Sequence, residues 1–277
     1  MVVTNKLVLD RLRFPLTLTT CQLSAAFVIT CPKLLLTGFS KVSLRDVLLY
    51  ALEASLFALS LYANLQALMR TGVGTVIVGR SAVPLITFIF EAMLAAEVRF
   101  RTMIRSVLSL IGVITFSTLY AATDGRVHMK SRIDAFWLTF WIFLVACQMI
   151  FGKWLISTVP LGRWERVFYT NSCALPFMLA LSQKELVEIY RTRSLISSST
   201  VGLVLISCFV GIGISYSSWR LRELVSPTTF GLVGVVNKMV TVCVSALIWP
   251  ESFSLQGIVA ITGCVLSALL YSGLRGR

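Results

Sequence analysis

Long apolar runs, each bounded by a short polar or charged segment, repeat along the whole chain. Most runs reach about 20 residues, the length that an α-helix needs to cross a hydrocarbon core of roughly 30 Å. A transmembrane barrel would alternate apolar and polar residues over about ten positions, and the run VLSLIGVITFSTLY shows no such alternation. The pattern predicts nine complete helical spans, at residues 14–36, 44–69, 73–96, 103–123, 133–157, 164–181, 200–219, 225–249 and 253–274.

The nine spans fall into two groups on either side of the polar segment 124–134. Residues 1–9 are apolar but too short to span, and we interpret them as the end of a first helix that is largely missing. The first half, residues 1–124, then holds this stub and four spans, and the second half, residues 125–277, holds five. Homologous halves with an odd number of spans insert in opposite orientations. We therefore expect one transport domain, built as an inverted repeat of five plus five helices.

The composition agrees with a membrane protein. Of the 277 residues, 57% are hydrophobic and 13% are charged, which indicates an all-α polytopic membrane protein. The basic residues that give the net charge of +13 are spread along loops, so they do not form a nucleic-acid recognition module. We interpret them as topology signals and as a source of anion attraction. The seven cysteines include no CxxC spacing, and we expect buried thiols without a metal site.

The span at 225–249 carries Asn237 and Lys238 in its middle. A lysine at that depth costs about 2.5–3.5 kcal/mol, so it should face the bundle interior and meet an anion there. Gly231 and Gly234 lie on the same helix face as this lysine and would let a bulky ligand approach the backbone. Close helix packing through small residues is the alternative interpretation.

Arg80 lies within the third predicted span. Aligning this span with the one that contains Lys238, on Glu97 and Glu251 at their ends, makes Arg80 equivalent to Gly234 and brings the two cations to corresponding depths. We therefore expect Arg80 and Lys238 to face one another and to hold the same anion.

Two carboxylates, Glu53 and Glu91, also fall within spans. They could take part in proton movement, but we favour pairing with these cations when no ligand is bound. The chain contains no nucleophile with a base, no metal-ligand spacing and no Gly-rich phosphate loop. We therefore expect no catalytic residue, no cofactor and no enzyme activity.

Four motifs, in order along the chain, resemble those of one transporter family. GVVNK at 234–238 is similar to a GALNK signature, and FYTN at 168–171 is similar to an FYNN signature. VGRSAVP at 78–84 resembles an FRSAVP run, and TNK at 4–6 with FP at 14–15 resembles the passage from the first helix to the second. These are motifs of the nucleotide-sugar transporters of the drug/metabolite transporter superfamily, in the branch that carries GDP-sugars across the Golgi membrane.

The resemblance implies a set of site residues. In the family the FYNN asparagines contact the nucleobase, and the residues up to the signature lysine contact sugar and phosphate. Tyr169 precedes the altered FYNN position, and we favour helix packing over base stacking for its ring. The candidate substrate-binding residues are Arg80, Tyr169, Thr170, Asn171, Ser215, Ser218, Phe230, Gly234, Asn237 and Lys238.

The resemblance also implies a function. It predicts a multi-pass Golgi membrane antiporter that moves GDP-mannose or GDP-fucose into the lumen and returns GMP by alternating access, with a homodimer as one allowed assembly. Thr170 stands where the family has an asparagine, so a carrier of UDP-sugars or sugar phosphates stays open. Because the first helix is incomplete, a transport-inactive membrane scaffold is the alternative from a different class.

Overall fold

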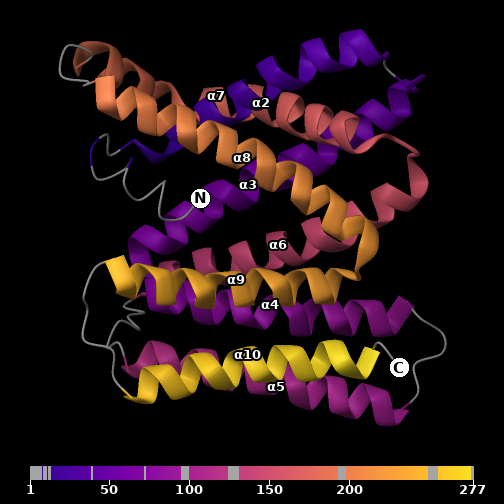
Figure 1. Cartoon of the computed structure of the whole chain (residues 1–277), viewed down its shortest axis with the longest axis vertical. Coiled ribbons are helices and arrows are strands. Elements are labelled where there is room, and N and C mark those ends of the chain that lie inside the picture. Colours follow the sequence, from indigo (N-terminus) through magenta and orange to yellow (C-terminus); the bar gives the residue numbers. More distant parts are fainter. Residues whose placement is uncertain are drawn as a thin grey trace. The chain divides into compact units, whose positions relative to one another are not determined.

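The computed structural model describes residues 8, 11, 14–38, 40–71, 73–94, 100–123, 131–192, 198–248 and 255–275. Over these residues the chain is all-α, with nine helices and no strand (Figure 1). The helices are α2 (Pro15–Thr37), α3 (Leu44–Thr71), α4 (Val73–Leu94), α5 (Phe100–Thr123), α6 (Arg132–Thr158), α7 (Arg163–Thr192), α8 (Ser198–Leu224), α9 (Pro227–Ile248) and α10 (Leu255–Arg275). The motif TNK at 4–6 lies outside the described residues.

Local sequence signals set several helix ends. At the start of α3 the Asp46 amide donates to Ser43 Oγ at 3.2 Å, and the Ser43 hydroxyl donates to Asp46 Oδ2 at 2.7 Å. Where α6 begins, the Ser131 amide donates to Asp134 Oδ2 at 3.0 Å and the Asp134 amide donates to Ser131 Oγ at 3.2 Å. Such reciprocal bonds satisfy amides that have no partner within the first turn of a helix. These short polar pairs therefore fix where two of the apolar helices start.

Helix α7 is longer than the sequence pattern predicts. The predicted span ends at residue 181 with a loop after it, but α7 continues to Thr192. On this extension the Glu185 carboxylate accepts hydrogen bonds from the Thr17 amide at 2.8 Å and the Thr17 hydroxyl at 3.1 Å. The loop prediction was wrong because a polar sequence does not end an amphipathic helix, which keeps its polar residues on one face.

The helices form two compact units, each made of two stretches of the chain. Unit 1 comprises Met1–Leu59 and Phe151–Leu224, and unit 2 comprises Ser60–Ile150 and Val225–Arg277. Unit 1 thus holds α2, α7, α8 and the parts of α3 and α6 at residues 44–59 and 151–158. Unit 2 holds α4, α5, α9, α10 and the rest of α3 and α6.

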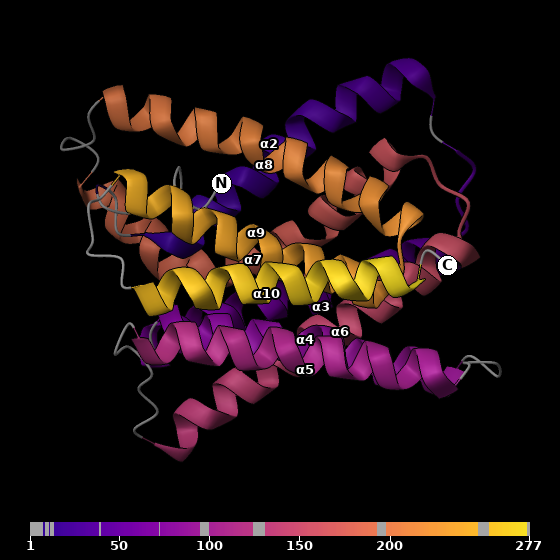
Figure 2. The ribbon, with the colours of Figure 1, turned by 60° about the horizontal axis from the view of Figure 1, so that its bottom comes forward.

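The three most extensive helix pairings join elements that are five helices apart in chain order. In unit 1, α2 packs on α7, and α8 also lies alongside α2 (Figure 2). In unit 2, α5 packs on α10 and α4 packs on α9, as Figure 1 shows at its lower end. Each of these pairs has one member from residues 1–124 and one from residues 125–277.

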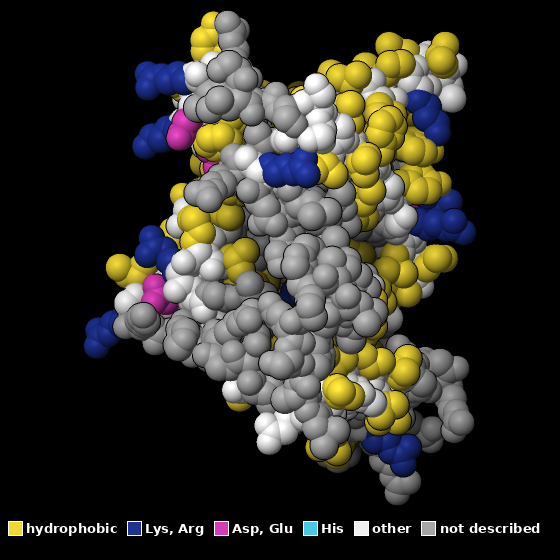
Figure 3. All heavy atoms as spheres, turned by 60° about the vertical axis from the view of Figure 1, so that its left-hand side comes forward, with side chains coloured by type: hydrophobic (Ala, Val, Ile, Leu, Met, Phe, Trp, Pro, Cys, Tyr) yellow, Lys and Arg dark blue, Asp and Glu magenta, His cyan; other side chains and the backbone are white. Residues whose placement is uncertain are grey.

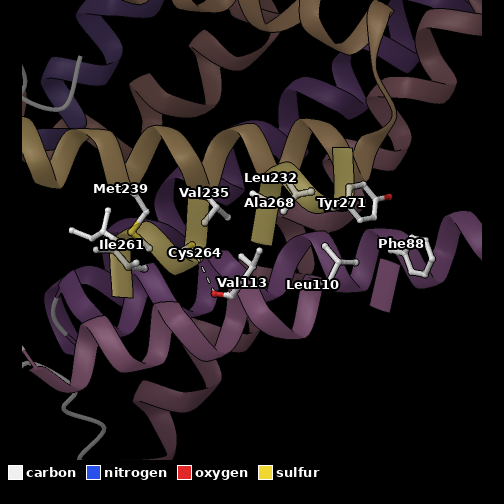
Figure 4. Close-up of a cluster of buried hydrophobic side chains, with 11 residues drawn as sticks. Phe88, Leu110, Val113, Leu232, Val235, Met239, Ile261, Cys264, Ala268 and Tyr271 are labelled. Atoms are coloured by element: carbon white, nitrogen blue, oxygen red, sulfur yellow. Dashed lines mark hydrogen bonds between the residues drawn. The ribbon is translucent and has the colours of Figure 1, made fainter. Parts of the chain in front are cut away.

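Apolar clusters fill both units. In unit 2 the cluster joins α4, α5, α9 and α10, and its fully buried members include Val113, Met239 and Tyr271 (Figure 4). Unit 1 has one cluster around Tyr50 and Trp219 and a second of mostly small residues around Ala54 and Ala174. Alanines in helix contacts let the backbones approach closely.

Many large apolar side chains also lie at the surface, as the face in Figure 3 shows, with Lys and Arg side chains standing out from it in several places. Of the six cysteines whose side chains are described, all are free thiols; Cys208 and Cys264 are buried, whereas Cys21 is exposed. The expectation of buried thiols is therefore wrong for Cys21. A cysteine behaves as a small apolar residue, so an apolar surface accommodates it.

Candidate substrate-binding residues

Arg80 on α4 lies against Gly234 on α9, within unit 2. A Cβ atom built on Gly234 would stand 2.9 Å from Arg80 Nη2 and 3.5 Å from Nε, so only a glycine leaves the guanidinium this position. The Arg80 side chain is half-buried, between the buried residues Gly79 and Ser81. The arginine of the run VGRSAVP at 78–84 thus lies against the first residue of the motif GVVNK at 234–238.

Lys238 follows Gly234 by four residues, or one turn of α9. Its side chain is half-buried, and Arg80 interacts with it electrostatically. Like charges on neighbouring turns repel one another, most strongly where little water screens them. An anion that contacts both removes the repulsion, and phosphate oxygens suit both groups, because arginine binds them in a planar fork and lysine as a point charge.

The rest of the contact between α4 and α9 is antiparallel, since successive contacts ascend along one helix and descend along the other. A Cβ on Gly231 would lie 3.2 Å from Pro84 Cγ, and the Thr87 hydroxyl donates to Thr228 Oγ1 at 3.3 Å. Gly231 is therefore a packing position. The prediction that it admits a ligand is not supported by its contacts, because Pro84 occupies that space.

Glu91, near the end of α4, accepts hydrogen bonds from the Thr228 amide at 2.7 Å and the Thr228 hydroxyl at 2.9 Å. Thr228 lies in the first turn of α9, where amides lack partners within the helix. A carboxylate there also complements the positive end of the helix dipole. The contacts of Glu91 with α9 thus serve the start of that helix.

Phe230 and Asn237, also in unit 2, lie at different depths on α9. Phe230 is half-buried in the second turn, and its amide donates to the Ser226 carbonyl at 2.9 Å. It precedes Lys238 by eight residues, which is about 12 Å along a helix. Asn237 has an exposed side chain, while its neighbour Lys238 is half-buried. Asn237 therefore lies on an exposed part of α9, whereas Phe230 lies half-buried one turn before Gly234.

In unit 1, the motif FYTN at 168–171 lies on α7, and its two polar residues are buried, with 5% exposure each. The Thr170 hydroxyl donates to Glu53 Oε2 on α3 at 3.2 Å. Asn171 Nδ2 donates to the Val167 carbonyl at 2.6 Å and to Ser215 Oγ on α8 at 3.2 Å. Asn171 and Ser215, two of the predicted base-binding residues, are therefore in direct contact.

Tyr169 belongs to an aromatic cluster. Its ring centroid lies 5.8 Å from that of Tyr50, which lies 6.1 Å from Trp219, and both Tyr50 and Trp219 are buried. Contacts of this kind stabilise helix packing, which agrees with the packing interpretation of Tyr169. Ser218 lies half-buried on α8, one turn from Ser215.

A charged network at one end of unit 1 was not anticipated from the sequence. Arg222 Nη1 lies 3.2 Å from Glu53 Oε1, and the two side chains are 11% and 1% exposed. The Lys153 ammonium donates to the carbonyls of Arg222 and Glu223 at 2.8 and 3.1 Å, and Glu223 pairs with Arg163 and Arg166. The predicted span at 200–219 ends before Arg222, but α8 continues through it to Leu224.

The expected partners of Glu53 were Arg80 and Lys238, and the ion pair found for it is with Arg222. The physical reason is that Arg222 remains on α8, where its side chain also lies over the Trp219 ring, 5.0 Å from the centroid. Gly152 on α6 is the sequence signal for this arrangement, because a Cβ there would stand 2.6 Å from Arg222 Nη1.

The predicted residues thus form two groups. Unit 2 holds the cations with Phe230, Gly234 and Asn237, and unit 1 holds Tyr169, Thr170, Asn171, Ser215 and Ser218. Within the described segments, no three His, Cys, Asp or Glu side chains come together as a metal site would require. The arrangement offers phosphate-binding cations and hydrogen-bonding groups suited to a base.

Six of the described helices are long and apolar enough to cross a membrane. Together with the exposed apolar surface, they make this an all-α polytopic membrane protein, as the hydrophobic pattern predicts. Cations and buried polar groups on spanning helices are costly in lipid and mark binding or transport sites. The fold therefore defines a polytopic membrane protein in which these charged and polar residues are candidates for a binding or transport site.

Comparison with curated proteins identifies the relatives. The chain is 27% identical over 279 residues to the GDP-mannose transporter GONST3 of Arabidopsis thaliana, covering 96% of this chain and 73% of that protein. It is 27% identical to GDP-fucose transporter 1 of the same plant, covering 79% and 64%, and 27% identical to the GDP-mannose transporter of Kluyveromyces lactis, covering 60% and 53%. The chain is thus a relative of the GDP-sugar transporters, as its motifs predict.

These relatives are transporters by name and not enzymes, which agrees with the expectation that the chain is not an enzyme. No family model matches the chain. A crystal structure of another protein, 13% identical in sequence, superposes with a TM-score of 0.67 over 93% of this chain and 88% of that one. At that identity the likeness concerns the fold alone.

Proposed function

We propose that this chain is an antiporter that moves a GDP-sugar, GDP-mannose or GDP-fucose, into the Golgi lumen in exchange for GMP. The observation that carries the proposal is the position of the Arg80 guanidinium on Gly234, beside Lys238. Two cations one helical turn apart along the α4–α9 contact favour an anion of more than one charge. The names of the relatives supply the rest, since they are transporters of GDP-mannose and GDP-fucose.

Each part of the nucleotide sugar has suitable residues. Arg80 and Lys238 bind the phosphates, the first in a fork and the second as a point charge. Asn171 and Ser215 bind the base, and the face of α9 with Phe230 and Gly234 receives the sugar. Both the GDP-sugar and GMP present a phosphate and a guanine, so the same residues serve the two exchange partners.

The helix pairing supports an inverted repeat. Helices five positions apart pack together, and α4 and α9 run antiparallel, as a twofold axis in the membrane plane requires. Arg80 and Gly234, which the alignment of the two halves makes equivalent, contact each other as positions on such an axis would. Carriers of this design expose one site alternately to each side of the membrane, which is the mechanism we propose here.

The location and assembly belong to the same proposal. A Golgi GDP-sugar carrier is a multi-pass protein of that membrane, with lipid as its surroundings and GMP as its returning ligand. The assembly that we propose is a homodimer.

The test is uptake of labelled GDP-mannose and GDP-fucose into proteoliposomes that contain the purified chain and are loaded with GMP, with UMP or with buffer alone. We expect GMP inside the vesicles to stimulate uptake of at least one of the two sugars several-fold over buffer. Stimulation by UMP instead would indicate a UDP-sugar carrier. Uptake equal to that of protein-free vesicles under every loading would favour the transport-inactive scaffold.

A further inference from the structure

The hydrogen bonds around Asn171 fix which of its groups a ligand can meet. A carboxamide has two N–H donors and one carbonyl acceptor. Both donors are engaged, one with the Val167 carbonyl at 2.6 Å and one with Ser215 Oγ at 3.2 Å. The group left for a ligand is therefore the carboxamide oxygen, an acceptor.

The hydroxyl hydrogen of the neighbouring Thr170 is also used within the protein. A hydroxyl has one hydrogen to donate and two lone pairs that accept. The Thr170 hydrogen points to Glu53 Oε2 at 3.2 Å, and an ionised carboxylate can only accept, so this direction is fixed. Thr170 therefore also presents acceptor lone pairs to a ligand.

Arg222 holds the Glu53 carboxylate beside Thr170. Its Nη1 lies 3.2 Å from Glu53 Oε1, and Glu53 is only 1% exposed, so the ion pair holds the carboxylate in place while its Oε2 accepts from Thr170. Arg222 is itself held, over the Trp219 ring and in the space that Gly152 leaves. The pair is thus built into α3, α6 and α8 around the motif on α7.

Two acceptors on adjacent residues select for a base with two adjacent donors. Among the common bases, guanine alone has this edge, with N1–H beside its 2-amino group. Uracil has one N–H between two carbonyls, and its oxygens would meet the protein's acceptors without a hydrogen between them. Such unpaired polar contacts are strongly disfavoured in a buried site.

We propose that Glu53 is a positioning residue that sets guanine selectivity, by holding the Thr170 hydroxyl as a donor to itself and so as an acceptor to the ligand. This inference rests on the proposed function, because it describes how the same carrier distinguishes its nucleotides. It also gives Thr170 a role in base selection although the residue lacks the carboxamide of the family motif.

The experiment measures competition. Uptake of labelled GDP-sugar into GMP-loaded proteoliposomes is inhibited with GMP, with UMP and with IMP, which lacks the 2-amino donor. The variants are Glu53→Gln, whose carboxamide can donate to Thr170 and release the hydroxyl hydrogen, and Thr170→Val, which removes the hydroxyl and leaves Glu53 and Arg222 in place. The matched control is Glu185→Gln on α7, since Glu185 also accepts from a threonine, Thr17, but at the far end of the helix.

For the unmodified chain we expect GMP to compete about tenfold better than IMP and better still than UMP. In Glu53→Gln and Thr170→Val the advantage of GMP over IMP and UMP should fall about tenfold, and in Glu185→Gln it should stay as in the unmodified chain. If Glu53→Gln does not fold, Thr170→Val decides alone. Unchanged selectivity in an active Glu53→Gln or Thr170→Val protein overturns the inference, while a lack of GMP preference in the unmodified chain overturns the proposed function itself.

Discussion

At the scale of single residues, two glycines make room for two arginines. Gly234 leaves space for the Arg80 guanidinium beside Lys238, and Gly152 leaves space for Arg222 beside Glu53. In both places the nearest atoms are at the end of a flexible side chain, which can move aside. A methyl group at either glycine would therefore displace an arginine while leaving the backbone where it is.

Gly234→Ala should reduce nucleotide affinity with little effect on stability. The new Cβ would stand 2.9 Å from Arg80 Nη2, so the guanidinium must leave its place beside Lys238. We expect the dissociation constant for GMP to rise about tenfold, the value of one charge-assisted hydrogen bond. Gly213→Ala, where a Cβ would meet nothing within 4 Å, is the control. Equal affinity in the two variants, measured by binding of labelled GMP, would contradict the assignment of Arg80.

Arg222→Met should destabilise the fold. It removes the cation 3.2 Å from a carboxylate that is 1% exposed, and breaking a buried pair from one side costs about 3–5 kcal/mol. Adding Glu53→Gln to this variant should recover much of the loss, because no buried charge then lacks its cation. Thermal unfolding in detergent measures both effects. A double variant no more stable than Arg222→Met would show that the pair does not account for the loss.

At the scale of elements, close packing between paired helices holds the fold together. α5 and α10 form the most extensive pairing, in which the Phe116 ring lies over Gly263 and Ser267 lies over Gly112. Between helices in lipid such close packing supplies the attraction, because lipid and apolar side chains are alike in polarity. Each of the two helices thus presents a glycine to a larger side chain of the other, and this complementarity favours the pairing of α5 with α10.

Gly263→Ala should loosen the α5–α10 pair. The added Cβ would overlap several atoms of the Phe116 ring, which has less freedom to move than an arginine tip. Overpacking of this kind costs about 1–3 kcal/mol. Gly202→Ala on α8, with nothing within 4 Å of the added Cβ, should be neutral or stabilising in the same thermal unfolding assay. A Gly263→Ala protein as stable as Gly202→Ala would contradict the packing seen for this pair.

The helices themselves were predictable because apolar runs of spanning length have one interpretation in a chain this hydrophobic. The end of α7 was not predictable, because residues 183–192 are too polar to be recognised as part of a membrane span. The residue that contacts Glu185 there, Thr17, comes from α2. Arg80 and Lys238 could be predicted as site residues because each is a cation within an apolar span. The pairing of Glu53 with Arg222 could not, because the two residues are 169 positions apart and no local pattern connects them.

At the scale of the whole molecule, the proposed transport depends on charge. A net charge of +13 raises the local concentration of anionic nucleotides, an effect that salt screens over roughly 8–10 Å. The contacts of Arg80 and Lys238 lie among packed helices and are screened much less. Raising the ionic strength should therefore slow nucleotide association more than it speeds dissociation, which stopped-flow binding of a fluorescent GMP analogue would measure. A larger effect of salt on the dissociation rate than on the association rate would contradict this account.

Direct binding of labelled GMP to the purified chain tests the role of the two cations most closely. The comparison is between the unmodified protein, Arg80→Ala, Lys238→Ala and Lys184→Ala, the last an exposed lysine on α7 that serves as the control. Removing either cation of the pair should weaken GMP binding about tenfold to a hundredfold, while Lys184→Ala binds as the unmodified protein does. Full GMP affinity in folded Lys238→Ala and Arg80→Ala proteins would show that the phosphate is held elsewhere.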